Sequence, residues 1–323
     1  MKNLFLNCLT TTFIVFFLFL NGCKPKAKDP APTASVTETA SAQQTDDNKS
    51  INDGLDNAIN SVRDGLSNSN ANGRSEIVAD CGVVIDYRKF KTEKTITYTY
   101  DGTDCKNAGI IRRGTIVVKL LAGNKYSEQG AKYSADFQAF TITINGKSIA
   151  LQGTVYNTNT TGGEPWGVIL GPWVTALGVN YKSTVIEVTR GTANASINNV
   201  SIAGWSIAKK TTFSRVDTTW SIAFDGDTSL NGYNKVLEWG NNRYGETFYK
   251  EMTTPFSVTS KCGGFLAFLR PSGGVCKMTV IKADKKKYYI NWEWLLSTSG
   301  CAEGYKLSIS DDDKNSWSTT VLY

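Results

Sequence analysis

The hydrophobic and polar positions divide the chain into stretches of different character, and the first is a short apolar run. Phe13 to Leu20 is unbroken apolar sequence that follows Lys2 and precedes Gly22-Cys23. A basic start and a short apolar region are typical of an export signal. The run is much shorter than the ~20 residues that a membrane-spanning helix needs. The pattern therefore predicts a signal peptide over residues 1–22.

A polar stretch and one helical pattern follow. Residues 24–49 contain hardly any large apolar side chain, so they bury too little surface to offset the entropy of ordering and are expected to be disordered. Apolar residues then recur at spacings of three and four, which predicts a short amphipathic helix over 50–66 that docks on the folded domain. Its apolar positions are Ile51, Leu55, Ile59, Val62 and Leu66. Residues 23–77 are thus predicted to be a tether that carries one short helix.

From about residue 78 the apolar positions alternate with a period of two. Thr95 to Tyr100 places Ile96, Tyr98 and Tyr100 on one strand face. Asn145-Gly146 separates two alternating segments and suits a type I′ hairpin turn. More than a dozen short strands with almost no helix predict an all-β fold of antiparallel, sandwich-like or barrel-like architecture. Besides 95–100, the candidate strands are 83–89, 115–121, 133–138, 140–144, 147–155, 181–189, 196–202, 205–208, 218–224, 233–239, 246–252, 264–269, 276–283, 288–296, 304–310 and 316–322.

Seven cysteines add a second pattern. Cys81 and Cys105 lie almost symmetrically about a predicted hairpin turn, which brings their ends together for a disulfide. Cys276 and Cys301 bracket a similar pair of strands, and by analogy they are expected to pair and to leave Cys262 free. The likeness predicts a duplication, with similar β domains at 78–190 and 191–323.

The charge and the residue types present limit the chemistry. The net charge is +6, and the basic residues are spread in short groups, which does not suit nucleic-acid binding. The chain has no histidine, which removes Ser-His-Asp and Cys-His catalysis and His-ligated zinc. We therefore expect no catalytic site, no metal and no cofactor.

Two groups of residues remain as candidate sites. Trp166 and Trp173 lie in a stretch punctuated by Gly and Pro, where tryptophans can form a stacking platform for a glycan or a peptide ligand, although packing under a loop is the favoured interpretation. Glu238, Glu246 and Glu251 lie near Trp239 and supply the carboxylates that a glycosidase would need. A carbohydrate-active enzyme is therefore an alternative function.

Leu20-Asn21-Gly22-Cys23 resembles the lipobox of bacterial lipoproteins. The resemblance implies that Cys23 becomes the first residue of the mature chain and carries acyl chains such as palmitate. Two or three chains would make membrane attachment effectively permanent, since each buried methylene contributes about 0.8 kcal/mol.

The region from about 80 to 310 is similar to Bacteroidetes-type exported lipoproteins, a group without an assigned biochemical function. The resemblance is carried by Asp101 to Cys105, Arg113-Gly114, Ile144 to Lys147, Gly240 to Gly245 and Gly300-Cys301. The alignment with this group favours a Cys262–Cys301 disulfide over Cys276–Cys301. These motifs are turn and strand signals, so they imply a fold and carry no chemistry.

Together these patterns predict a non-catalytic binding or structural module of the cell envelope, anchored in the outer membrane through Cys23. Lys24, Lys26 and Lys28 stand where many surface-displayed lipoproteins carry acidic residues, which favours the periplasmic face. A surface adhesin is the other alternative.

Overall fold

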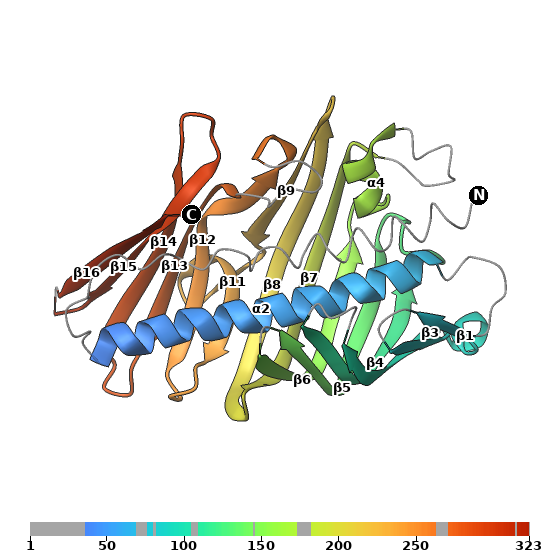
Figure 1. Ribbon diagram of the computed structural model, residues 1–323, viewed down its shortest axis with the longest axis horizontal. Coiled ribbons are helices and arrows are strands. Elements are labelled where there is room, and N and C mark those ends of the chain that lie inside the picture. The colour runs from blue at the N-terminus through green and yellow to red at the C-terminus, as the bar shows by residue number, and fades with distance from the viewer. Residues whose placement is uncertain are drawn as a thin grey trace.

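The computed structural model describes residues 36–68, 76–79, 82–104, 109–144, 146–172, 182–262, 271–313 and 315–322. These residues form one curved sheet that partly encloses a long helix, α2 (Val36–Asn68) (Figure 1). The short helices are α3 (Phe90–Glu93), α4 (Pro165–Leu170) and the 3-10 helix η3 (Ser260–Cys262). The strands are β1 (Glu76–Ala79), β2 (Val83–Asp86), β3 (Thr95–Asp104), β4 (Ile110–Ala122), β5 (Ala131–Ile144), β6 (Lys147–Asn159), β7 (Thr184–Ile197), β8 (Val200–Val216), β9 (Thr219–Gly226), β10 (Thr228–Leu230), β11 (Tyr233–Asn241), β12 (Thr247–Thr259), β13 (Pro271–Ile281), β14 (Lys287–Leu296), β15 (Ala302–Asp311) and β16 (Ser316–Leu322).

The sheet is antiparallel throughout, and most strands pair with their neighbours in the sequence. Among the described strands, the departures lie around β8 and β12. Strand β8 pairs with β7 on one side and with both β9 and β11 on the other, and β9 also pairs with β12. Register shifts in β5, β8, β11 and β12 mark bulges, which bend a sheet and increase its twist. The all-β antiparallel fold expected from the alternation is confirmed.

The boundary predicted after residue 190 does not divide the sheet. It falls inside β7, a strand of 14 residues that pairs with β6 and β8 along its length. The sheet continues through this point from β1 to β16. The likeness between the two halves of the sequence therefore stays a sequence-level prediction, whereas the strands of both halves share one layer.

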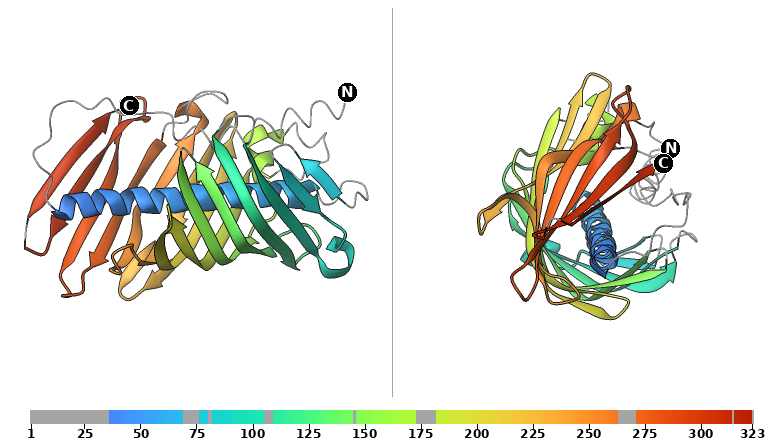
Figure 2. Two further views of the ribbon diagram at one scale, coloured as in Figure 1. Left: turned by 60° about the horizontal axis from the view of Figure 1, so that its bottom comes forward. Right: turned by 90° about the vertical axis from the view of Figure 1, so that its left-hand side faces the viewer.

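Helix α2 is much longer than the sequence pattern predicts. It begins at Val36, so residues 36–49, assigned above to a disordered tether, are helical. The helix runs through the concave side of the sheet, from the β13–β16 end towards β3 and β4 (Figure 2). The apolar spacing that defined 50–66 covers only the second half, because the buried positions of the first half are polar.

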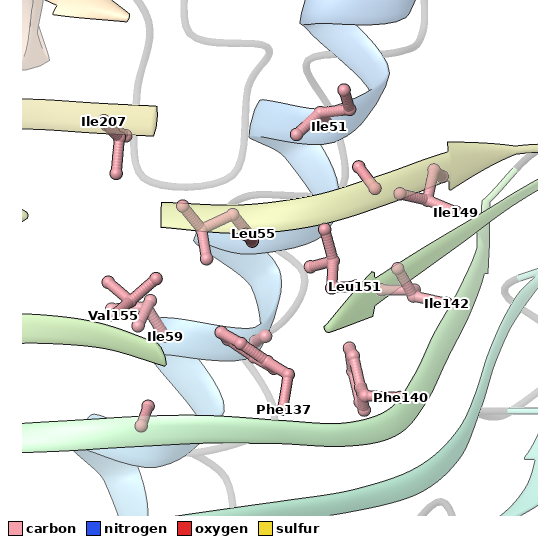
Figure 3. Packing of buried hydrophobic residues seen from close by; sticks show 14 of the residues in the cluster. Ile51, Leu55, Ile59, Phe137, Phe140, Ile142, Ile149, Leu151, Val155 and Ile207 are labelled. Atoms are coloured by element: carbon pink, nitrogen blue, oxygen red, sulfur yellow. The ribbon is translucent and has the colours of Figure 1, made fainter. Parts of the chain in front are cut away.

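The main core lies between the second half of α2 and the strands beneath it (Figure 3). Ile51, Leu55 and Ile59 on the helix are almost fully buried, and they face Ile142 and Leu151 of the sheet. Burial of such side chains is the main favourable contribution to folding. The tyrosine Tyr98, which is also buried, donates a hydrogen bond from its hydroxyl to the Val62 carbonyl at 3.1 Å.

The predicted hairpin at Asn145-Gly146 is confirmed by pairing of Ile144 with Lys147 across the turn. Gly146 has φ of +77°, the left-handed region that this turn needs and that glycine adopts at no steric cost. The candidate strand 316–322 is β16, whereas the candidate strand 264–269 lies outside the described residues.

Candidate functional site

The concave face of the sheet forms the main buried core together with α2. One row of cross-strand partners crosses it from β3 to β16, and its side chains are apolar except at one place. In order the row is Ile96, Val118, Ala135, Val155, Gly191, Ile207, Glu238, Lys250, Met278, Ile290, Ile309 and Trp317. We call this set the transverse row. Glu238 and Lys250 are its only charged members.

Glu238 is completely buried and forms an ion pair with Lys250, whose Nζ donates to Oε1 at 2.8 Å. The indole Nε1 of Trp205 donates to the other carboxylate oxygen at 3.4 Å. Burial lowers the pKa of Lys250, but attraction by Glu238 and a hydrogen bond to it, together with the neighbouring Cys276 and Asp53, outweigh burial, so the pKa is raised. The Glu238 carboxylate is thus held by Lys250 and Trp205, and both contacts lie within the folded chain.

A second buried carboxylate, Glu187 on β7, accepts hydrogen bonds from the Arg63 guanidinium of α2 and from the Tyr126 hydroxyl. The Tyr126 hydroxyl also lies 2.5 Å from Asn157 Oδ1, and Asn157 Nδ2 donates to Thr189 Oγ1 at 3.0 Å. Burial raises the pKa of Tyr126 well above its usual range, and the neighbouring Glu187 charge raises it further. The network anchors the C-terminal part of α2 to the β4–β5 loop and to strands β6 and β7.

Helix α2 carries acidic residues that meet basic residues of the sheet along its length. Asp46 pairs with Lys147, Asp47 with Arg243, and Asp56 with Lys209. The Asp47 pair is bidentate, with Nε to Oδ2 at 2.6 Å and Nη2 to Oδ1 at 2.5 Å. The uncharged Asn57 accepts from Arg112 Nε at 2.9 Å. The helix is thus held by charge pairs as well as by apolar packing.

The buried stripe of α2 changes character along the helix. Ser41, Gln44 and Asn48 continue the spacing of Ile51 and Leu55 towards the N-terminal end, and all five are buried. Asn48 Nδ2 lies 4.0 Å from the Met278 sulfur, in the transverse row. The first half of the helix therefore presents polar side chains to an apolar part of the sheet.

The predicted tryptophan platform is only partly within the described residues. Trp166 is half-buried in α4, a helix that packs over a second apolar cluster through Val168 and Ile169. Arg215 Nη1 donates to the Ile169 carbonyl at 2.6 Å. Trp173 lies outside the described residues. Helix α4 therefore packs on β7, β8 and β9, and the role of the two tryptophans stays a prediction.

Among the described residues, Cys262 and Cys301 form a disulfide, and Cys276 is a buried free cysteine. The expectation of a Cys276–Cys301 bridge is therefore wrong, and the alternative is confirmed. Cys262 ends η3, which brings its sulfur to the start of β15, whereas Cys276 lies within β13 beside Met252. Burial raises the pKa of the Cys276 thiol to about 12. Cys23, Cys81 and Cys105 lie outside the described residues.

The three glutamates considered for catalysis have separate structural partners. Glu238 is bound by Lys250, and Glu246 accepts from Asn242 Nδ2 at 2.8 Å and from the Tyr288 hydroxyl at 3.1 Å. Glu251 accepts from the backbone N–H of Asn234 at 2.9 Å. None of these contacts needs a substrate to explain it.

The residues that join α2 to the sheet are not apparent from local sequence patterns. The recurring acidic positions Asp46, Asp47, Asp53 and Asp56 were the available signal, but basic partners such as Arg243 lie almost 200 positions away in the chain. Cross-strand register and helix placement bring them together.

Within the described ranges, no helix is both long and apolar enough to cross a bilayer. The same residues contain no group of three or more Cys, Asp or Glu side chains placed to hold a metal ion. No protein-family model matches the chain, and no curated protein or solved structure is significantly similar to it.

Proposed function

We propose that the chain is a lipid-anchored lipoprotein of the outer membrane that acts as a non-catalytic binding or structural module. The observation that carries the binding role is the concave face, where one continuous sheet receives a helix through charge pairs. The buried carboxylates Glu187 and Glu238 are both occupied by structural partners. The anchor rests on the sequence around Cys23.

The anchor is tested by mass spectrometry of the mature amino terminus. We expect the chain to begin at Cys23 with a diacylglyceryl group on the thiol and an acyl group on the amine. Cys23→Ser should move the protein from the membrane fraction to the soluble fraction. An unmodified thiol at the mature terminus would contradict the anchor.

The membrane face is tested separately by protease treatment of whole cells. Orientation towards the periplasm predicts that the protein survives until the outer membrane is permeabilised. Digestion of intact cells would instead support surface display, as an adhesin requires. The alternative of a carbohydrate-active enzyme has no specific observation in its favour, given the partners of Glu238, Glu246 and Glu251.

A further inference from the structure

The first half of α2 and the sheet beneath it are poorly matched in polarity. At the β13–β16 end, the transverse row consists of Met278, Ile290, Ile309 and Trp317, and Val280 and Tyr288 lie in the adjacent row. We call these six residues the apolar strip. Five of them are in the main core cluster, and Trp317 packs against it. The N-terminal end of α2 lies along this part of the sheet in all views (Figures 1 and 2).

The buried side chains of this half of the helix are polar, and one of them, Asn48, contacts Met278 of the strip. Ser41, Gln44 and Asn48 are 0%, 1% and 3% exposed. Ser41 Oγ and Gln44 Oε1 are buried without a hydrogen-bond partner. A buried polar atom without a partner loses its bond to water and gains nothing in return. This half of the helix is therefore a poor cover for the strip, in contrast to the half that contains Ile51 and Leu55.

Charge pairs hold the first half in place. Asp47, whose side chain is 1% exposed, occupies the guanidinium fork of Arg243, and Asp46 pairs with Lys147. The fork of Arg243 thus already binds a carboxylate, in the bidentate geometry that arginine forms with this group. Asn48, the residue next to Asp47, touches Met278 of the strip. A carboxylate site and an apolar surface therefore adjoin.

We propose that residues 36–48 are a displaceable cover and that the site beneath binds a long-chain fatty acid. The carboxylate of the ligand replaces that of Asp47 at Arg243, and the alkyl chain replaces Ser41 and Gln44 over the apolar strip. Binding removes the two unpartnered polar atoms from the interior, since both return to water when the cover opens. The second half of α2 stays docked through its apolar contacts and the Arg63–Glu187 pair.

This inference names a ligand for the proposed binding role and rests on that role, but it does not require the anchor. The test uses the full chain with Cys23→Ser, so that no acyl chain of the protein itself occupies the site. Oleate below its critical micelle concentration is titrated by calorimetry, and hydrogen exchange is followed along α2. We expect oleate to bind and to accelerate exchange in 36–48 while 51–66 remains protected.

Variants of the buried stripe test whether the cover competes with the ligand. Gln44→Leu removes the unpartnered Oε1 at the cost of the hydrogen bond from Gln44 Nε2 to Asn48 Oδ1, and it places an apolar side chain in the cover. It should raise the melting temperature and weaken oleate binding by about tenfold or more. The matched control is Ala42→Leu at an exposed position of the same helix, where neither quantity should change. Ser41→Val serves as a second variant of the same kind. Equal oleate affinity in Gln44→Leu, Ser41→Val and the control would overturn the proposal.

Variants of the charge pair test the position of the head group. Asp47→Asn frees Arg243 and loosens the cover, so oleate affinity should rise. Arg243→Gln should abolish the preference for oleate over oleyl alcohol, a ratio that is independent of how readily the cover opens. Absence of oleate binding even in Asp47→Asn would overturn the proposal, as would an unchanged ratio in Arg243→Gln. If the protein is membrane-attached but binds no oleate, the fatty-acid proposal is wrong and the anchor proposal stands. If it binds oleate but is found in the soluble fraction, the anchor proposal is wrong and the fatty-acid proposal stands.

Discussion

Gly54 lies where α2 comes very close to the sheet. A Cβ at this position would stand 3.1 Å from Ile142 Cγ2 and 3.6 Å from Ile149 Cγ2. In the sequence this glycine counts against a helix, because it costs about 1 kcal/mol relative to alanine. In the structure, glycine allows the helix to pack closely on the sheet, since a larger side chain would separate the helix from β5 and β6.

We expect Gly54→Val to lower the free energy of unfolding by about 1–3 kcal/mol, the usual effect of overpacking a filled core. The measurement is urea unfolding followed by circular dichroism. Ala42→Val, on the exposed side of the helix, controls for the lower helix propensity of valine. If both variants lose the same free energy of unfolding, the close contact with Ile142 does not determine the effect of Gly54→Val.

Asp53 is a residue whose charge opposes folding. Burial raises the pKa of its carboxyl above 3.8, and Lys49, which pairs with it at 2.6 Å, only partly offsets this effect. Because the folded state has the higher pKa, the carboxylate lowers stability at neutral pH. This loss is relieved as the pH falls through the raised pKa and is absent below 3.8.

Asp53→Asn should therefore increase the free energy of unfolding at pH 7, and the difference from the unsubstituted chain should vanish at acidic pH. Paired urea titrations across that pH range measure both values. A difference that persists below the ordinary pKa of aspartate would mean that the amide acts through a new contact instead of through charge.

At the scale of elements, the junction of α2 with β7 depends on one buried charge pair. Glu187 is 0% exposed and Arg63 is its cationic partner. Removing one member of a buried pair leaves the other charge without compensation, at a cost of about 3–5 kcal/mol. We expect Arg63→Met to lose this amount, and Arg63→Met with Glu187→Gln to recover part of it. A double-mutant cycle measures the coupling, and strictly additive losses would contradict it.

The same helix shows how far the sequence can predict an element. The second half of α2 follows from the spacing of Ile51, Leu55 and Ile59 alone. The first half has the same geometry, but Ser41 and Gln44 occupy its buried positions, so no apolar period signals it. Its stability comes from Arg243 and other partners distant in the chain, which local patterns do not report. Strands were easier to predict, because their alternation directly reflects one buried and one exposed face.

For the whole molecule, a continuous sheet and a helix that crosses it favour one cooperative unit. Two independent domains at 78–190 and 191–323 would unfold separately, whereas β7 and β8 pair across that boundary. We expect a single thermal transition whose calorimetric and van't Hoff enthalpies agree. The Cys262–Cys301 bridge stays oxidised in this experiment, because reduction would introduce a second process. Two resolved transitions would show that the halves are energetically separate.

The all-β class was accessible from alternation and turn residues, but the joining of both halves into one sheet was not. Some strand bounds were also wrong, because the candidate strand 196–202 spans the turn between β7 and β8, and the candidates 133–138 and 140–144 are both parts of β5. Cysteine spacing suggested Cys276–Cys301, whereas the resemblance to exported lipoproteins favoured Cys262–Cys301. The path of β12 into η3 is what places Cys262 beside Cys301. The candidate site could not be predicted from the sequence for a related reason. The pairing register of the strands places Glu238, Lys250 and Met278 side by side. No local sequence motif encodes that register.

The order of the chain places α2 before every described strand, while the surface that receives its polar half is made from β13 to β16. During synthesis the helix segment thus appears long before its counterpart exists. Asp47 meets Arg243 only after nearly 200 further residues have been added. In a nascent or prematurely terminated chain we therefore expect this segment to stay undocked and accessible to proteases. Closure of the first half of α2 over the sheet therefore reports that the C-terminal strands have been made and folded.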